Sequence, residues 1–431
     1  METRSKISID PVLAGRIKTA WQKLSPDQRN RIAPMVMNAH QQAVKVSQSQ
    51  VAPAPNANMG HALPLMFSTI TDDHDGVMGS LDLNIIIAAD GGGEIWGTGK
   101  YEQLDPGWLG AAAEWLEHFI VPIHAFNTTP AAPIQIPDNV QIGLAGDWGT
   151  GDWRSDKNPA PSTDVRKHLA FLEPHLTIHL GDVYYAGTGG EEQHLLVQLW
   201  PSGSLGWSLA LNSNHEMYSG AGAYFNAISN PPFAQQAGCS YFALYNNYWV
   251  IVGLDSAYYS DQDTLYRDGA LFPSGGGHQE QVEFLRAQAV GAAKNNKKLI
   301  LLTHHNGISQ DGTTPTPLWS QVMSAFPPDS GPDYWYWGHV HMGAVYQNWK
   351  NGAKVVNCRC CGHGALPCAA PSIMENQTNV AWYEKRSAND PDFADWPYNL
   401  QRVLNGFSML YLDGPLIKEV FYDENGGVAW P

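Results

Sequence analysis

The chain has 431 residues, which exceeds the usual size of one compact domain, so we expect more than one folded unit. Its formal net charge of −16 argues against nucleic acid and anionic membranes as partners, because like charges repel. The N-terminal sequence lacks the apolar core of a secretory signal, and no stretch has the length of a membrane span. We therefore expect a cytoplasmic protein, unless a leader has been removed.

The first part of the chain, residues 1–50, is predicted to be a helical segment. Its apolar residues recur at roughly helical spacing, which predicts one helix over 10–24 and another over 26–47. Ser25 followed by Pro26 is a typical helix start, because serine caps the helix and proline fits its first turn.

A linker rich in Ala, Pro and Asn is predicted at 51–60, and residues 61–126 are expected to form a small α+β domain. Within this domain the pattern predicts a strand over 81–89 and a helix over 108–120. A second proline-rich connection, 127–137, leads from this domain into the rest of the chain.

Over residues 139–425, apolar strand candidates alternate with helix candidates, which is typical of a layered α/β domain. The predicted strands are 140–145, 176–180, 205–211, 248–254, 299–303 and 334–337. The predicted helices are 162–173, 190–200 and 278–294. Near the C-terminus, Asp413-Gly414 between two apolar runs predicts a β-hairpin.

Five short motifs in this region are rich in residue types that bind metal ions. They are Gly146-Asp147-Trp148-Gly149, Gly181-Asp182-Val183-Tyr184-Tyr185, Asn214-His215-Glu216, His304-His305 and Gly338-His339-Val340-His341. Most follow a predicted strand, and in open α/β sheets the ligand-binding groups gather at the carboxyl ends of the strands. Carboxylates, an amide, imidazoles and a phenol delivered to one edge can hold two metal ions side by side. This arrangement favours hydrolysis, above all of a phosphate ester.

The same motifs resemble those of the calcineurin-like metallophosphoesterases, and most closely those of the purple acid phosphatase branch. In that branch the first motif reads Asp-x-Gly and the second reads Gly-Asp-x-x-Tyr, and Asp147-Trp148-Gly149 and Gly181-Asp182-Val183-Tyr184-Tyr185 follow both patterns. The resemblance covers roughly residues 139–425, whereas residues 1–138 show none. It implies a four-layer α/β/β/α metallophosphoesterase sandwich, with a smaller α+β region at the N-terminus.

The resemblance also implies a dinuclear metal centre and its ligands. The first metal would be bound by Asp147, Tyr185 and His341, the second by Asn214, His304 and His339, and Asp182 would bridge both. Carboxylates and a phenolate suit Fe(III) in the first site, whereas imidazoles and an amide suit Fe(II), Zn or Mn in the second. The alternative for the tyrosine pair is that Tyr184 or Tyr185 only lines the pocket.

By the same resemblance, His215 would contact the substrate and assist the leaving group, while a metal-bound hydroxide attacks phosphorus. Glu216 would either orient His215 or be an exposed loop acid. His305, Glu216 and Trp148 are candidates for lining the substrate pocket, although packing is the usual role of a large apolar side chain such as Trp148. Ser213 departs from the family, which has glycine before the Asn-His pair, and glycine tolerates unusual backbone angles.

Four of the five cysteines lie within 358–368, together with His363. Their spacing lacks the paired two-residue gaps of zinc ribbons, so we favour small buried residues near a strand end over a thiolate metal site. An odd count without a regular spacing does not indicate a disulfide framework.

The sequence thus predicts a dinuclear metal-dependent hydrolase that acts on a small phosphate ester, with a phosphomonoesterase of purple acid phosphatase type as the favoured activity. A phosphodiesterase acting on a cyclic nucleotide or another small diester at the same site is one alternative. A binding protein that retains the fold without turnover is another, and Ser213 is its only support in the sequence. An oxygen-using enzyme on the same centre is neither supported nor excluded, and the oligomeric state is not indicated.

Overall fold

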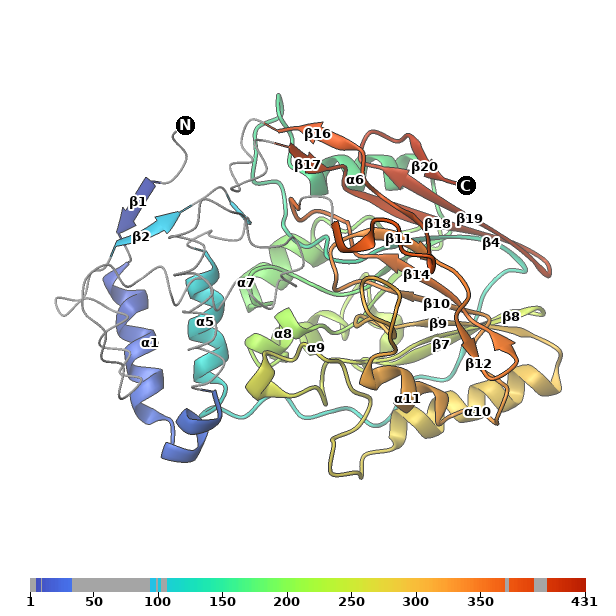
Figure 1. Ribbon diagram of the computed structural model, residues 1–431, viewed down its shortest axis with the longest axis horizontal. Helices are drawn as coiled ribbons and strands as arrows, with labels where there is room; N and C mark the ends of the chain where they lie inside the picture. Colours follow the sequence, from blue (N-terminus) through green and yellow to red (C-terminus); the bar gives the residue numbers. More distant parts are fainter. Residues whose placement is uncertain are drawn as a thin grey trace.

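The structure is a computed structural model that describes residues 5–8, 10–32, 94–97, 100–101, 107–368, 372–390 and 401–431. Two large β-sheets form its centre, and helices pack outside them (Figure 1). Among these described residues, no helix combines the length and the apolar character that crossing a membrane requires.

The first large sheet has six strands in the order β20-β19-β18-β4-β5-β6. Its strands are β4 (Asn139–Ala145), β5 (Leu176–His179), β6 (Ser208–Ala210), β18 (Gly406–Asp413), β19 (Leu416–Asp423) and β20 (Val428–Trp430). Strands β4, β5 and β6 run parallel, and β18 pairs antiparallel with β4. The predicted C-terminal hairpin is confirmed, because β18 and β19 pair along their whole length up to Asp413 opposite Leu416.

The second large sheet has eight strands in the order β15-β11-β14-β10-β9-β8-β7-β3. Its strands are β3 (Ile134–Gln135), β7 (Phe242–Tyr245), β8 (Trp249–Gly253), β9 (Lys298–Leu302), β10 (Tyr334–Trp337), β11 (Gly343–Tyr346), β14 (Asn357–Cys361) and β15 (Val380–Tyr383). Strands β8, β9, β10 and β14 run parallel. The sequence predicted β8, β9 and β10, but not the other five strands.

The two sheets pack face to face through a core of buried aliphatic side chains. Ile142 and Ile178 of the six-stranded sheet share this core with Ile300 of the eight-stranded sheet. Burying such side chains contributes about 1.5–3 kcal/mol each, so this layer is a main source of the stability that holds the two sheets together.

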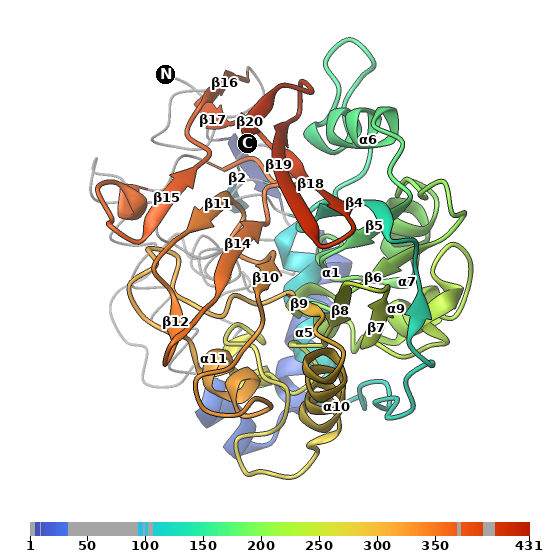
Figure 2. The ribbon, with the colours of Figure 1, turned by 90° about the vertical axis from the view of Figure 1, so that its right-hand side faces the viewer.

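Helices cover the outer faces of both sheets. They are α6 (Pro161–Phe171), α7 (Gly189–Glu191), a π-helical turn (Glu192–Val197), α10 (Glu280–Lys294) and α11 (Pro317–Met323). Apolar residues of α10 and α11 pack on the eight-stranded sheet, and those of α6 pack on the six-stranded sheet, at opposite sides of the molecule in Figure 2. The four-layer α/β/β/α arrangement is therefore confirmed, and all three predicted helices are present.

The N-terminal region packs against the edge of this sandwich. α1 (Pro11–Lys23) lies beside α5 (Trp108–Glu117), and Arg16 of α1 forms ion pairs with two glutamates of α5. α5 in turn packs on α8 (Asn214–Tyr218), which follows β6. One apolar cluster therefore continues from α1 and α5 into the sandwich.

The predicted helix starts in this region agree with the structure where it can be compared. α1 is capped by Asp10, and a second helix starts at Pro26 and continues to Ile32. Ser25 and Gln28 exchange hydrogen bonds at the start of that helix, as a capping box does. The remainder of the helix predicted over 26–47, the linker at 51–60 and the strand at 81–89 lie outside the described residues.

The remaining elements are short. They are β1 (Ser5–Ser8) paired with β2 (Glu94–Gly97), α9 (Gly222–Ala227), β12 (Lys350–Asn351) paired with β13 (Lys354–Val355), β16 (Ser387–Asn389) paired with β17 (Gln401–Val403), and single turns of 3₁₀ helix at Ala234–Gln236, Gln262–Thr264 and Ser372–Met374. The division of the chain into domains at 1–50, 61–126 and 139–425 stays a prediction.

Candidate metal centre

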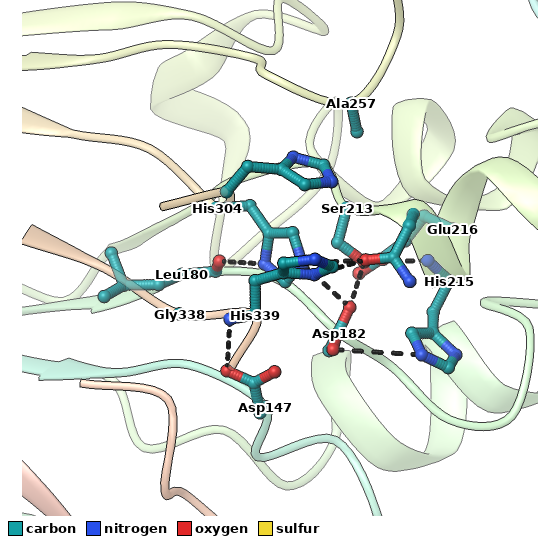
Figure 3. Close-up of polar contacts among 12 residues, drawn as sticks. Asp147, Leu180, Asp182, Ser213, His215, Glu216, Ala257, His304, Gly338 and His339 are labelled. Atoms are coloured by element: carbon teal, nitrogen blue, oxygen red, sulfur yellow. Dashed lines mark hydrogen bonds and ion pairs between the residues drawn. The ribbon is translucent and has the colours of Figure 1, made fainter. Parts of the chain in front are cut away.

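Six of the seven predicted ligand residues lie just beyond the carboxyl ends of strands from both sheets. Asp147, Asp182 and Asn214 follow β4, β5 and β6 of the six-stranded sheet. His304 follows β9, and His339 and His341 follow β10, in the eight-stranded sheet. All six side chains are buried, and Figure 3 shows Asp182 in contact with its neighbours at the centre. The structure thus brings together side chains that are far apart in the sequence.

Four of these residues have backbone angles that side-chain-bearing residues rarely adopt. The φ angles are 58° for Asp147, 77° for Asp182, 68° for His339 and 46° for His341. Such a conformation costs on the order of 1–3 kcal/mol per residue and is typical of functional sites. At Gly181, with φ of 100°, a Cβ would collide with the imidazole of His304, so only glycine fits before Asp182.

One cluster in the centre consists of two carboxylates, an imidazole and a phenol. His341 Nε2 lies 3.1 Å from Asp147 Oδ1 and 3.6 Å from Asp182 Oδ2. The Tyr184 hydroxyl donates to Asp182 Oδ2 at 2.7 Å and lies 3.1 Å from His341 Nε2. Burial and the Asp182 carboxylate raise the pKa of Asp147 well above its usual range. Two buried carboxylates this close to each other are the surroundings that a bound cation stabilises.

A second cluster consists of two imidazoles, an amide and the other oxygen of Asp182. His304 Nδ1 donates to the Leu180 carbonyl at 2.8 Å, so its proton is on that nitrogen. His304 Nε2 then faces Asn214 Oδ1 at 2.9 Å and Asp182 Oδ1 at 3.2 Å. His339 Nδ1 lies 3.1 Å from the same oxygen of Asn214.

The chemistry of this second cluster fits a metal ion. Burial lowers the pKa of His304, so the neutral form is favoured and Nε2 carries a lone pair. Asn214 Nδ2 donates to the Tyr218 hydroxyl, which turns the Asn214 oxygen towards the imidazoles. Lone pairs on nitrogen and oxygen therefore face one another, and a cation between them converts this repulsion into coordination. The carbonyl that holds His304 is also the usual outer partner of a metal-binding imidazole.

His305 lies beside this cluster, but both of its ring nitrogens are already engaged. Nε2 donates to the Tyr266 carbonyl at 2.7 Å, and Nδ1 accepts from the Ser256 hydroxyl at 2.9 Å. His304, His305 and His339 are near enough together to hold an ion by distance alone. Because the nitrogens of His305 are occupied, Asn214 is the better third donor. His305 is also buried, so the structure offers no support for its predicted place in the substrate pocket.

The two adjacent tyrosines of the second motif occupy different surroundings. Tyr184 is fully buried, and its hydroxyl belongs to the first cluster. The ring of Tyr185 stacks on Tyr101 and meets Trp108 edge-on, with ring centroids 4.7 Å and 4.9 Å away. The structure thus places the Tyr184 hydroxyl against the carboxylates, and Tyr185 as a metal ligand stays a prediction.

His215 lies next to the Asp182 carboxylate. Its Nδ1 donates to the Tyr185 carbonyl at 2.7 Å, and its Nε2 lies 3.9 Å from Asp182 Oδ2. The ring packs against Trp108 of α5 and against Tyr184. Burial lowers the pKa of His215, and the Asp182 carboxylate opposes this effect. The imidazole is therefore held in one orientation, with Nε2 as the nitrogen that can exchange a proton.

Ser213 fits its position without strain, because its φ of −136° and ψ of 176° are extended backbone that any residue adopts. Its hydroxyl caps α8 by accepting from the His215 amide, and it contacts the carboxylates of Asp182 and Glu216. Glu216 is fully buried, so the alternative of an exposed loop acid is wrong. The Glu216 hydrogen bond to a side chain goes to Ser213 and not to His215.

Trp148 packs inside the protein. It is fully buried, donates from Nε1 to the Ser162 carbonyl at 2.9 Å and meets Trp200 edge-on. This agrees with the packing role considered for it and gives no support to a place in the substrate pocket. The cysteines of 358–361 lie in β14 and are buried and unpaired, and the metal-binding clusters found in the described part of the chain contain no cysteine.

Sequence reasoning missed three residues that the structure places at or beside the centre, namely Tyr184, Trp108 and Arg267. Tyr184 was considered only as a pocket residue. Trp108 was expected in a helix without a stated role, and it packs on His215 from a part of the chain outside the family resemblance. Arg267 lies in a loop after β8 and lines a cavity that reaches His339. In the sequence, the only indication of Arg267 was that it is a basic residue between two apolar strands.

A comparison with known families finds a match over the part of the chain that holds the site. A model of the family described as calcineurin-like phosphoesterase matches residues 140–343, the stretch that supplies every residue of both clusters. Residues 140–343 therefore form a calcineurin-like phosphoesterase domain. The protein is thus a hydrolase of phosphoric esters.

Solved structures show weaker likenesses. GAP50, described as the anchor in the inner membrane complex of Plasmodium, is 12% identical, with a TM-score of 0.45, and the match covers 68% of this chain and 87% of that one. A dimetal phosphatase from Danio rerio is 11% identical, with a TM-score of 0.41, and the match covers 66% of this chain and 95% of that one. Neither likeness is close enough to transfer a function. The search of curated proteins found no match.

Proposed function

We propose that the protein is a dinuclear metal-dependent phosphomonoesterase of purple acid phosphatase type. The observation that carries this proposal is the meeting of two donor clusters at Asp182, with one oxygen of this carboxylate in each cluster. A bridging carboxylate of this kind suits two metal ions side by side. The first ion would be held by Asp147, Asp182, Tyr184 and His341, and the second by Asp182, Asn214, His304 and His339.

The donor sets favour different ions. Two carboxylates and a phenol in the first cluster are hard oxygen donors, which suit Fe(III). Two imidazoles and an amide in the second suit Fe(II), Zn or Mn. When bound, the pair of ions would neutralise phosphate charge and make water a nucleophile near neutral pH.

The protein's own residues would orient the substrate and transfer the proton to the leaving group. In the hydrolysis, water adds to phosphorus, the ester P–O bond breaks, and the alcohol leaves with a proton. His215 Nε2 is available for that proton, because Nδ1 is committed to the Tyr185 carbonyl. A bound phosphate dianion next to Nε2 would favour the protonated imidazole and oppose the effect of burial. Trp108 and Tyr184 hold the ring in place on two sides.

The proposal is tested on purified protein by metal analysis, a visible spectrum and two substrates. We expect about two metal ions per chain and faster hydrolysis of p-nitrophenyl phosphate than of bis-p-nitrophenyl phosphate. Preference for the diester would establish the phosphodiesterase alternative. A preparation that stays inert after addition of Fe, Zn and Mn would instead support the binding protein.

Adjacent histidines provide a matched control for the ligand set. His304→Ala removes a proposed donor, so we expect loss of about one metal ion per chain together with activity. His305→Ala leaves every proposed donor in place, so the metal content should stay that of the wild-type protein. Loss of metal from His305→Ala alone would show that the second cluster is assigned wrongly.

A further inference from the structure

A polar cavity opens beside the proposed second metal position. Its volume is about 340 Å³, and His339 forms part of its wall. Most of the other lining side chains carry amides, hydroxyls or charges, and they include Arg267, Asn306, Ser309, Gln310, Thr313 and Thr316. A pocket of this character accepts a small polar group and gives little binding energy to an aromatic or aliphatic one.

The wall formed by the loop after β9 is held in shape by its own hydrogen bonds. The Thr316 hydroxyl donates to the Asn306 carbonyl at 2.8 Å. The carboxylate of Asp311, which also lines the cavity, accepts from the hydroxyls of Ser309 and Thr313 at 2.6 Å and 2.8 Å. These hydrogen bonds hold the Asp311 carboxylate to its own loop while it keeps its charge, and Arg267 is the one lysine or arginine among the lining residues.

Arg267 also lines the cavity, and its side chain forms one hydrogen bond within the described residues. Its Nε donates to the Thr264 carbonyl at 3.0 Å, and within the described residues its guanidinium forms no ion pair. By contrast, the buried guanidinium groups of Arg359 and Arg402 each bind a glutamate. Asp268 also lines the cavity, but it is exposed and not within ion-pair distance of Arg267. The two terminal nitrogens of Arg267 are thus not engaged by any hydrogen bond or ion pair found among the described residues and can bind a ligand.

The cavity itself relates Arg267 to the metal centre. Arg267 and His339 both line it, so the guanidinium lies beside the proposed second metal position, in the space open to the alcohol part of a phosphate ester.

We propose that this cavity binds the alcohol part of the substrate and that Arg267 pairs with a second anionic group on it. The substrate class is a phosphate ester of a small, hydroxyl-bearing alcohol that also carries a carboxylate or another phosphate. A planar guanidinium binds either group through two parallel hydrogen bonds. This inference rests on the proposed phosphomonoesterase function and specifies its substrate.

Two pairs of substrates test the inference on the metal-loaded protein. 3-Phosphoglycerate and glycerol 3-phosphate share a three-carbon backbone and differ in the carboxylate. Fructose 1,6-bisphosphate and fructose 6-phosphate differ in the second phosphate. We expect a higher kcat/KM for the more anionic member of at least one pair, and the pair that shows it tells whether the second group is a carboxylate or a phosphate.

Variants of Arg267 decide whether this residue causes the preference. Arg267→Gln should lower kcat/KM for the preferred anionic substrate by about 10- to 100-fold, the usual worth of a charge-assisted pair, and change that for its partner by less than about 3-fold. Arg267→Lys should restore part of the preference because it keeps the charge. Arg286→Gln, on the outer helix α10, is the matched control and should behave as the wild-type protein.

Equal losses on both members of a pair, or no wild-type preference in either pair, would overturn the inference while hydrolysis of p-nitrophenyl phosphate left the proposed function intact. No hydrolysis of any of these esters by the metal-loaded protein would overturn both. Metal analysis of Arg267→Gln should give the wild-type content, which separates loss of substrate binding from damage to the centre.

Discussion

We expect opposite effects at the first metal position when the neighbouring residues Tyr184 and Tyr185 are each replaced. The Tyr184 hydroxyl lies 2.7 Å from Asp182 Oδ2, whereas the ring of Tyr185 stacks on Tyr101. If the first ion is Fe(III), Tyr184→Phe should abolish the visible charge-transfer band and lower the iron content. Tyr185→Phe should keep the band, and an absorption spectrum of each variant checks both outcomes. Loss of the band only in Tyr185→Phe would restore the ligand position expected from the family pattern.

His215 is the second residue whose role can be isolated. Its Nε2 lies near the bridging carboxylate without belonging to either donor cluster. His215→Ala should therefore lower kcat by about 10²- to 10⁴-fold, the range typical of a lost proton-transfer group, with the metal content unchanged. Steady-state kinetics and metal analysis on the same sample provide the check. A parallel fall in both quantities would mean that His215 binds a metal ion.

For single residues, the sequence predicted the position of the centre well, because both the residue types and their places at predicted strand ends can be read from the sequence. Asp147, Asp182 and Asn214 were placed at strand ends that the structure confirms. The choice between Tyr184 and Tyr185 was not accessible, since it depends on which way each side chain leaves a loop that starts in left-handed backbone at Asp182. The buried position of Glu216 was not accessible either, because burial of a loop acid depends on neighbours distant in the sequence.

Among the elements, α5 joins the N-terminal region to the catalytic domain. Trp115 on this helix is fully buried and donates from Nε1 to the Gln262 carbonyl at 3.0 Å. Trp115→Ala should lower the free energy of unfolding by about 3–5 kcal/mol, because it leaves a large cavity and an unpaired carbonyl. Trp115→Phe keeps most of the volume and should cost less.

Denaturant unfolding followed by circular dichroism measures both Trp115 variants. Because Trp108 on the same helix contacts His215, undocking of α5 should also reduce kcat in Trp115→Ala. Full activity with an unchanged unfolding curve would show that α5 contributes nothing to the domain on which it packs.

The elements that the sequence failed to predict share a physical reason. β14 reads Asn-Cys-Arg-Cys-Cys, and its Arg359 would argue against a central strand. In the structure Arg359 is buried and paired with Glu419 of β19 through bonds of 2.6 Å and 2.9 Å. Arg359 is tolerated in the sheet because it pairs with a residue 60 positions away. Such a distant partner leaves no strand pattern in the local sequence. Strands of apolar residues, such as β4 and β9, needed no such partner and were predicted.

For the whole molecule, bound metal should be a source of stability. The four residues in left-handed backbone at the centre are strained, and their carboxylates repel one another without a cation. A ligand that binds only the folded state at 100 times its Kd adds about 2.7 kcal/mol. Prolonged dialysis against a chelator should therefore lower Tm by about 3 °C or more, and Zn or Fe added back should restore it.

Scanning calorimetry of the chelated and reloaded protein gives this comparison directly. His304→Ala should show a smaller shift on chelation than the wild-type protein, because it holds fewer ions at the start. An identical Tm before and after chelation, with metal loss verified by elemental analysis, would contradict the stabilising role of the centre.

The pairing of β18 with β4 bears on how this protein can be divided for expression. The family match spans 140–343, yet β4 has β18 as a neighbour, with Asn139 opposite Asp413. β14, which also follows residue 343, separates β10 from β11 in the second sheet. A recombinant fragment cut at the family boundary would therefore carry an open strand edge and a sheet missing an internal member, which invites aggregation. The unit to clone extends at least through β19.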